Sequence, residues 1–122
     1  MHLVYKNLNE QMFYRHFDGA AFGDPQLVEE VQDWATQAST TLVSGSLVIC
    51  YNHPVSTNTD YRFYTRRVSG GIVGDAAVLD GSGGFKGYPT APATADSAPM
   101  CLYGKTPDAN SAGNIELLPG GN

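Results

Sequence analysis

Glycine and proline are concentrated in the second half of this 122-residue chain, and this bias limits its possible folds more than any other feature. Eleven of its 14 glycines and five of its seven prolines lie in residues 70–122. A segment of this composition loses much conformational entropy on ordering and buries little apolar surface in return. To become ordered, it needs a large contact surface, either on the first half of the chain or on neighbouring copies in an assembly.

The length of the chain is that of one domain, because a fold of this size buries about two-thirds of its unfolded surface around one core. We expect a core over residues 1–80. Residues 81–122 are expected to form an extended loop or arm with short strands, at 100–104 and 115–118. Residues 1–122 would then make up a single domain.

The charge of the chain points to protein partners. Charged residues make up 16% of it, compared with about 25% in ordinary soluble domains. The net charge of −5 disfavours nucleic-acid binding, which needs a concentrated positive surface. We see no apolar stretch long enough to span a bilayer and no signal peptide in residues 1–6. These features leave the location undefined, with a virion or the host cytoplasm as the expected places.

One amphipathic helix is predicted over residues 25–38. Asp24 is suited to the N-cap, Pro25 to the first helical position, and Glu29 and Glu30 to the first turn. An apolar stripe then recurs at helical spacing, formed by Leu27, Val28, Val31, Trp34, Ala35 and Ala38. We expect this stripe to pack against a sheet.

Alternating apolar and polar residues predict that sheet. Residues 42–52, 61–68 and 72–79 read as three consecutive antiparallel strands. Residues 53–60 form the first connection, Gly70 and Gly71 form the second turn, and Gly74 marks a possible bulge. Residues 3–8 and 12–17 are expected to be extended. The expected fold class is therefore α+β, with one helix on a meander and a long Gly/Pro-rich arm.

The predicted order of a helix followed by a strand that begins Leu42-Val43-Ser44-Gly45 is similar to the cystatin arrangement. In cystatins, that strand carries a Gln-x-Val-x-Gly loop, and Thr41 stands here in place of the glutamine. We do not extend the inhibitory activity of cystatins to this chain.

Cys50 and His53 are the residues that could form a nucleophilic pair, with Asp60 as the nearby acid. On a strand they would point to opposite faces, so we expect a buried cysteine and a loop histidine. A zinc site would need Cys101, His2 or His16 in addition, and we expect no metal, cofactor or enzymatic activity. Free cysteines are expected, and a disulfide between Cys50 and Cys101 is the alternative.

The segment 61–67 interleaves aromatic and basic residues. Alternation places Arg62, Tyr64 and Arg66 on one face of a strand. Such a face could stack on nucleic-acid bases, but the acidic net charge favours a protein interface. Phe13, Tyr14, Arg15, His16 and Phe17 form a second aromatic and basic cluster.

Together these features predict a structural or interaction protein that is a subunit of a larger assembly. A virion component, such as a capsid-associated, decoration or connector protein, suits the composition best. The expected interface comprises Arg62, Tyr64, Arg66, Tyr88, Pro89, Pro92 and Pro99, and contacts other copies or neighbouring virion subunits. The alternative is a monomeric α+β binding or inhibitor module that acts on a protein target, and a more remote alternative is an enzyme using Cys50 and His53.

Overall fold

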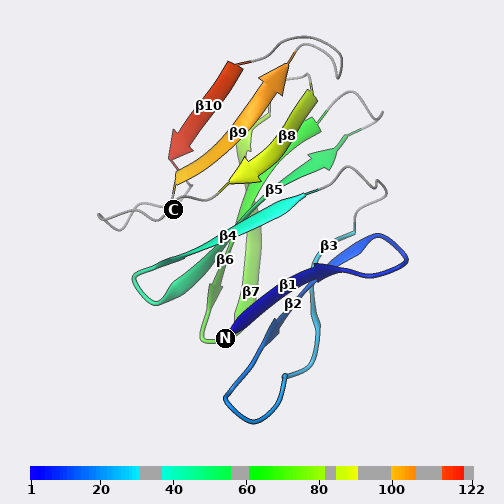
Figure 1. Cartoon of the computed structure of the whole chain (residues 1–122), viewed down its shortest axis with the longest axis vertical. Coiled ribbons are helices and arrows are strands. Elements are labelled where there is room, and N and C mark those ends of the chain that lie inside the picture. Colours follow the sequence, from blue (N-terminus) through cyan, green and yellow to red (C-terminus); the bar gives the residue numbers. More distant parts are fainter. Residues whose placement is uncertain (31–36, 56–60, 82–84, 91–99, 107–113, 120–122) are drawn as a thin grey trace.

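The computed structural model describes residues 1–30, 37–55 and 61–81 with their side chains, and the backbone of 85–90, 100–106 and 114–119. These residues are all-β and contain no helix (Figure 1). The strands are β1 (His2–Lys6), β2 (Gln11–His16), β3 (Gln26–Glu30), β4 (Ala38–Val43), β5 (Ser46–Pro54), β6 (Tyr61–Ser69), β7 (Ile72–Asp80), β8 (Phe85–Thr90), β9 (Met100–Thr106) and β10 (Asn114–Pro119).

The strands pair in antiparallel sheets. Strands β4, β5, β6 and β7 form a four-stranded meander in chain order, which is the central sheet. Strands β1, β2 and β3 form an amino-terminal sheet, and β10, β9 and β8 form a third. Every connection inside a sheet joins neighbouring strands, so the pairing is local along the chain.

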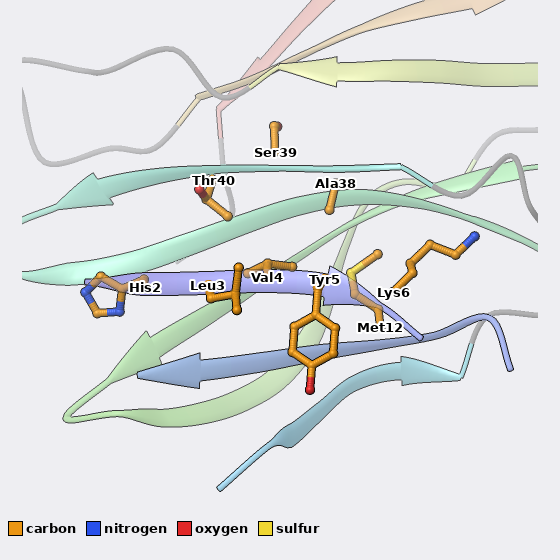
Figure 2. Close-up of a pocket in the computed structure, with 9 residues that line it drawn as sticks. All are labelled: His2, Leu3, Val4, Tyr5, Lys6, Met12, Ala38, Ser39 and Thr40. Atoms are coloured by element: carbon orange, nitrogen blue, oxygen red, sulfur yellow. The ribbon is translucent and has the colours of Figure 1, made fainter. Parts of the chain in front are cut away.

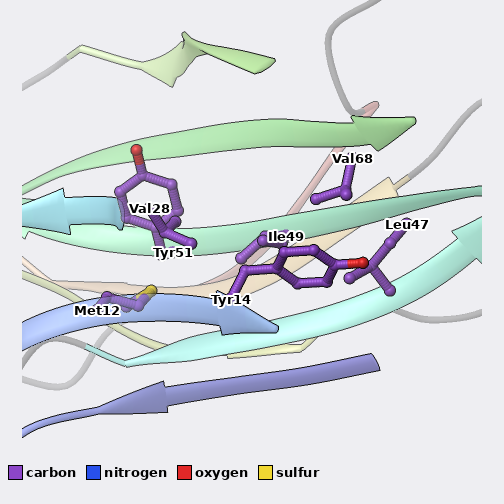
Figure 3. Packing of buried hydrophobic residues seen from close by; sticks show 7 residues of the cluster. All are labelled: Met12, Tyr14, Val28, Leu47, Ile49, Tyr51 and Val68. Carbon is purple, nitrogen blue, oxygen red and sulfur yellow. The ribbon is translucent and has the colours of Figure 1, made fainter. Parts of the chain in front are cut away.

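The main core lies between the amino-terminal sheet and the central sheet (Figure 3). Met12 and Tyr14 of β2 and Val28 of β3 meet side chains of β5 and β6 there. The cluster consists of Met12, Tyr14, Val28, Leu47, Ile49, Tyr51 and Val68. Its members are all 3% exposed or less, so this packing holds the two sheets together.

The opposite face of the central sheet is also covered. Val43, Val48, Cys50 and Phe63 form a second buried cluster there, and β8 lies against β4, β5 and β6. Strand β5 is therefore buried on both faces, which explains why its sequence is almost continuously apolar instead of alternating with polar residues.

Two-residue turns close the first and the last hairpin of this meander, β4–β5 and β6–β7. Ser44 and Gly45 have φ of 48° and 79°, and Gly70 and Gly71 have φ of 59° and 81°. Positive φ at both central positions is the turn geometry that matches the twist of antiparallel strands. The turn at Gly70 and Gly71 was predicted, whereas that at Ser44 divides the single strand predicted over residues 42–52.

The helix predicted over residues 25–38 is wrong. Residues 26–30 form β3 and residue 38 begins β4, while 31–36 lie outside the described residues. Pairing with β2 outweighs the local helix signals, because it places Val28 in the main core. The Gln26 side chain also bonds to the backbone of Gly71 and Val73, which ties β3 to β7.

The α+β class and the long arm are corrected with it. Strands β8, β9 and β10 form a sheet in the carboxy-terminal half, and β9 and β10 contain the two short strands that were predicted there. The resemblance to cystatins is wrong as well, because it depended on the predicted helix. The predicted strands over 61–68 and 72–79 are confirmed by β6 and β7, and β7 has a register shift opposite Arg66 and Val68, next to Gly74.

Candidate functional site

A cleft of about 360 Å³ lies between β1 and β4 (Figure 2). It is lined by β1, by Met12 and by residues 38–40 of β4. Figure 2 shows Ala38 and Thr40 directed from β4 towards β1, whereas Ser39 points to the opposite side of the central sheet. The floor is apolar at Val4 and Met12, and the two ends of the β1 wall carry His2 and Lys6.

The cleft exists because the two facing sheets differ in width. The amino-terminal sheet has three strands and the central sheet four, and the face of β4 that carries Ala38, Thr40 and Leu42 remains exposed. Leu42 is 59% exposed and Leu3, on β1, is 39% exposed. Both β1 and β4 are edge strands, and no other described strand pairs with their outer edges. Unpaired backbone groups next to apolar side chains are able to accept a further strand.

A polar network links β3 to the central sheet. Tyr51 Oη on β5 donates to Glu29 Oε2 on β3 at 2.9 Å, and Arg66 Nε on β6 donates to Tyr51 Oη at 3.2 Å. Arg66 Nη2 lies 3.6 Å from Glu29 Oε2, and its Nη1 donates to the carbonyl of Gly74 at 2.9 Å. Each charged group is therefore neutralised between the two sheets, as a half-buried ion pair requires.

A bulge delivers Glu29 to this network. Met12 pairs with Glu29 and Phe13 with Leu27, so Val28 is the extra residue on β3. A bulge re-aims the side chains next to it. Here the consecutive residues Val28 and Glu29 both face the central sheet, one in its apolar core and one on Tyr51.

Burial changes the ionisation of two groups near the network. Burial raises the pKa of Tyr51 well above its usual 10.0, with the hydrogen bond to Arg66 opposing it. Burial also lowers the pKa of His53 from 6.5, and the charge of Glu29 partly offsets the effect. Tyr64 stacks on Tyr51 with ring centroids 5.6 Å apart and meets the edge of His53 at 6.1 Å. Both shifts favour the neutral forms of Tyr51 and His53.

The structure places the predicted interface residues in different environments. Arg62, Tyr64 and Arg66 share a face of β6, as predicted, but this is the face that the amino-terminal sheet covers in part. Arg66 is bonded inside the protein, Tyr64 is half-buried, and Arg62 is exposed. Tyr88 and Pro89 lie in β8, at a register shift between Gly87 and Thr90. Pro92 and Pro99 lie outside the described residues.

The cysteines differ from the expectation of free thiols, because Cys50 is disulfide-bonded. Its side chain is fully buried, and the sequence has one other cysteine, Cys101. An oxidised Cys50 offers no thiolate for nucleophilic attack. His53 is half-buried beside Tyr64, and Asp60 lies outside the described residues. Within the described part of the chain, no group of three or more His, Cys, Asp or Glu side chains is placed to hold a metal ion.

A histidine pair and the cleft are the features that sequence reasoning missed. His2 on β1 and His16 on β2 are direct cross-strand partners, and their ring centroids are 5.2 Å apart. The Nδ1 atom of His2 lies 2.8 Å from the hydroxyl of the buried Tyr14. Burial is the main cause that lowers the pKa of His2, and the adjacent His16 adds to it. In the sequence, the spacing of His2, Val4 and Lys6 by two residues indicates that they share one face of a strand. It does not indicate which residues of another strand they face.

Comparison with known proteins adds no functional assignment, because no protein family, curated protein or solved structure matches this chain. Among the residues that the structure describes, no helix is long and apolar enough to cross a membrane.

Proposed function

We propose that this protein is a structural or interaction protein that works as a subunit of a larger assembly, and that the cleft between β1 and β4 receives a strand of a neighbouring copy. The observation that carries the proposal is the uncovered face of β4 beside two unpaired edges. A soluble protein usually covers or charges such an edge. Residues 38–43 of β4 contain no charged residue.

A copy of this chain suits the cleft better than a nucleic acid. The β1 wall carries the cationic Lys6 at one end, while the chain as a whole has a net charge of −5, so an incoming acidic subunit meets one positive side chain there. Lys6 already has a partner in Glu10 at 3.4 Å, so the attraction is modest and apolar contact with Val4 and Leu42 has to supply most of the affinity.

A virion component, such as a capsid-associated, decoration or connector protein, remains the more specific form of this proposal. Its support is the low content of charged residues, at 16%, together with the abundance of small residues in the second half. The sheet of β8, β9 and β10 replaces the free arm in this proposal, so the contacts with neighbours are assigned to the β1 and β4 edges instead of an arm.

The test is the solution mass of three proteins, measured by light scattering on a sizing column. The wild type is expected to form an oligomer, and Leu42→Lys is expected to dissociate it by placing a charge in the apolar contact. Ile72→Lys is the matched control, because Ile72 is 69% exposed in β7 at the turn after β6. Wild-type protein that remains a 13.0 kDa monomer at high concentration would contradict the proposal and favour a monomeric module that binds another protein. Equal dissociation of both variants would show that the cleft is not the interface.

A further inference from the structure

We propose that His2 and His16 form a two-imidazole site for a divalent transition metal ion of the zinc class, at the edge of the amino-terminal sheet. This site shares His2 with the wall of the cleft, but it does not require the assembly proposed above, and its test measures metal binding and not oligomeric state. Its basis is the cross-strand pairing of the two residues, which are register partners in β1 and β2. Imidazole is a preferred ligand for zinc, copper and nickel ions.

The separation of the two rings fits a shared ion. A tetrahedral zinc ion binds each imidazole nitrogen at about 2.0 Å, which places the two ring centroids about 5 Å apart. The centroids of His2 and His16 are 5.2 Å apart, with the ring planes inclined by 37°. The centroid separation therefore matches the one that a shared ion requires.

The surroundings of His2 resemble the support that metal-binding histidines receive. Its Nδ1 is within hydrogen-bond distance of the Tyr14 hydroxyl, at 2.8 Å, which leaves Nε2 for a metal. Fixing one ring nitrogen orients the ring and the other nitrogen, as outer hydrogen bonds do in known metal sites. Tyr14 is fully buried, so this orienting group is itself held in place.

The charges near the pair are of both signs, because the amino-terminal ammonium acts on His2 and a carboxylate acts on His16. The Asp18 carboxylate is close enough to His16 for the two charges to interact, although its Oδ1 accepts bonds from the amides of Ala20 and Ala21. With two protein ligands, the remaining coordination positions are open to water. Such a site binds reversibly and leaves positions free for a further ligand.

The experiment is zinc titration of the untagged full-length chain by isothermal calorimetry, followed by NMR of the imidazole rings. Wild type is expected to bind one ion per chain, and the ring signals of His2 and His16 are expected to move. His16→Ala removes an exposed ligand and is expected to weaken zinc binding at least about tenfold. Loss of a hydrogen-bond partner that only orients a metal ligand already has an effect of this size. His53→Ala is the control and should bind as wild type does.

Two results would overturn the proposal. One is the absence of one-to-one zinc binding by the wild type while its fold is intact by circular dichroism. The other is equal affinity of wild type and His16→Ala, which would place any bound zinc elsewhere. Because His16 is exposed, we expect His16→Ala to fold as the wild type does, so loss of folding does not obscure the second result.

Discussion

Replacing Tyr51 by phenylalanine should destabilise the protein by about 2 kcal/mol. The change removes one hydroxyl that donates to Glu29 at 2.9 Å and accepts from Arg66 at 3.2 Å, and it leaves the buried ring in place. A hydrogen bond to a charged group contributes about 1.5–3 kcal/mol. Two such bonds are lost, but the side chains of Glu29 and Arg66 are each 21% exposed and still face one another, so water and the ion pair recover part of the loss.

The assay is urea unfolding followed by circular dichroism, with Tyr64→Phe as the matched control. Tyr64 stacks on Tyr51, and its hydroxyl makes no hydrogen bond with the described residues, so its removal should change the free energy of unfolding by less than about 0.5 kcal/mol. If Tyr51→Phe is as stable as the wild type, the polar network does not join the two sheets. If both variants lose the same stability, ring packing and not hydrogen bonding is responsible.

Three further predictions concern pH, the disulfide and a turn. Burial raises the pKa of Tyr51, so the unfolded chain releases the phenolic proton at a lower pH than the folded chain does. The free energy of unfolding should therefore be constant below pH 10.0 and fall above it. Urea unfolding from pH 8 to 11 should show a less steep fall for Tyr51→Phe. Because Cys50 is buried and disulfide-bonded, a non-reduced peptide map should link it to Cys101. Reduction should lower the free energy of unfolding by about 4 kcal/mol, the value for a closed loop of roughly fifty residues. An unchanged melting temperature in reductant would refute this. Ser44 has a φ of 48°, so Ser44→Asn should raise the free energy of unfolding by about 0.5–1 kcal/mol, and a loss of stability would show that its side chain matters more than its backbone.

The strands that could be predicted are those whose pairing partners are close in sequence. Residues 61–68 and 72–79 alternate, a Gly-Gly pair joins them, and the structure pairs them as β6 and β7. The helix over 25–38 failed because the consecutive residues Leu27 and Val28 fit helical spacing and a bulged strand equally well. Only the pairing with β2, which lies on the far side of a turn, decides between them.

The candidate sites depended on information that is not local. The cleft arises because three strands face four, and no single segment records that difference. Glu29 reaches Tyr51 only through a bulge, and His2 reaches His16 only through the register of β1 and β2. Arg66 was placed on the correct face by alternation alone, yet its role inside the protein required the position of Glu29.

The central claim, that the cleft between β1 and β4 binds a neighbouring copy, is tested most directly by amide hydrogen exchange at two protein concentrations. Peptides covering residues 2–6 and 38–43 should exchange more slowly at the high concentration, because the incoming strand pairs with their unpaired edges. Peptides from the β6–β7 turn should exchange equally at both concentrations. Exchange in residues 38–43 that is independent of concentration, in a sample that light scattering shows to be oligomeric, would contradict the claim.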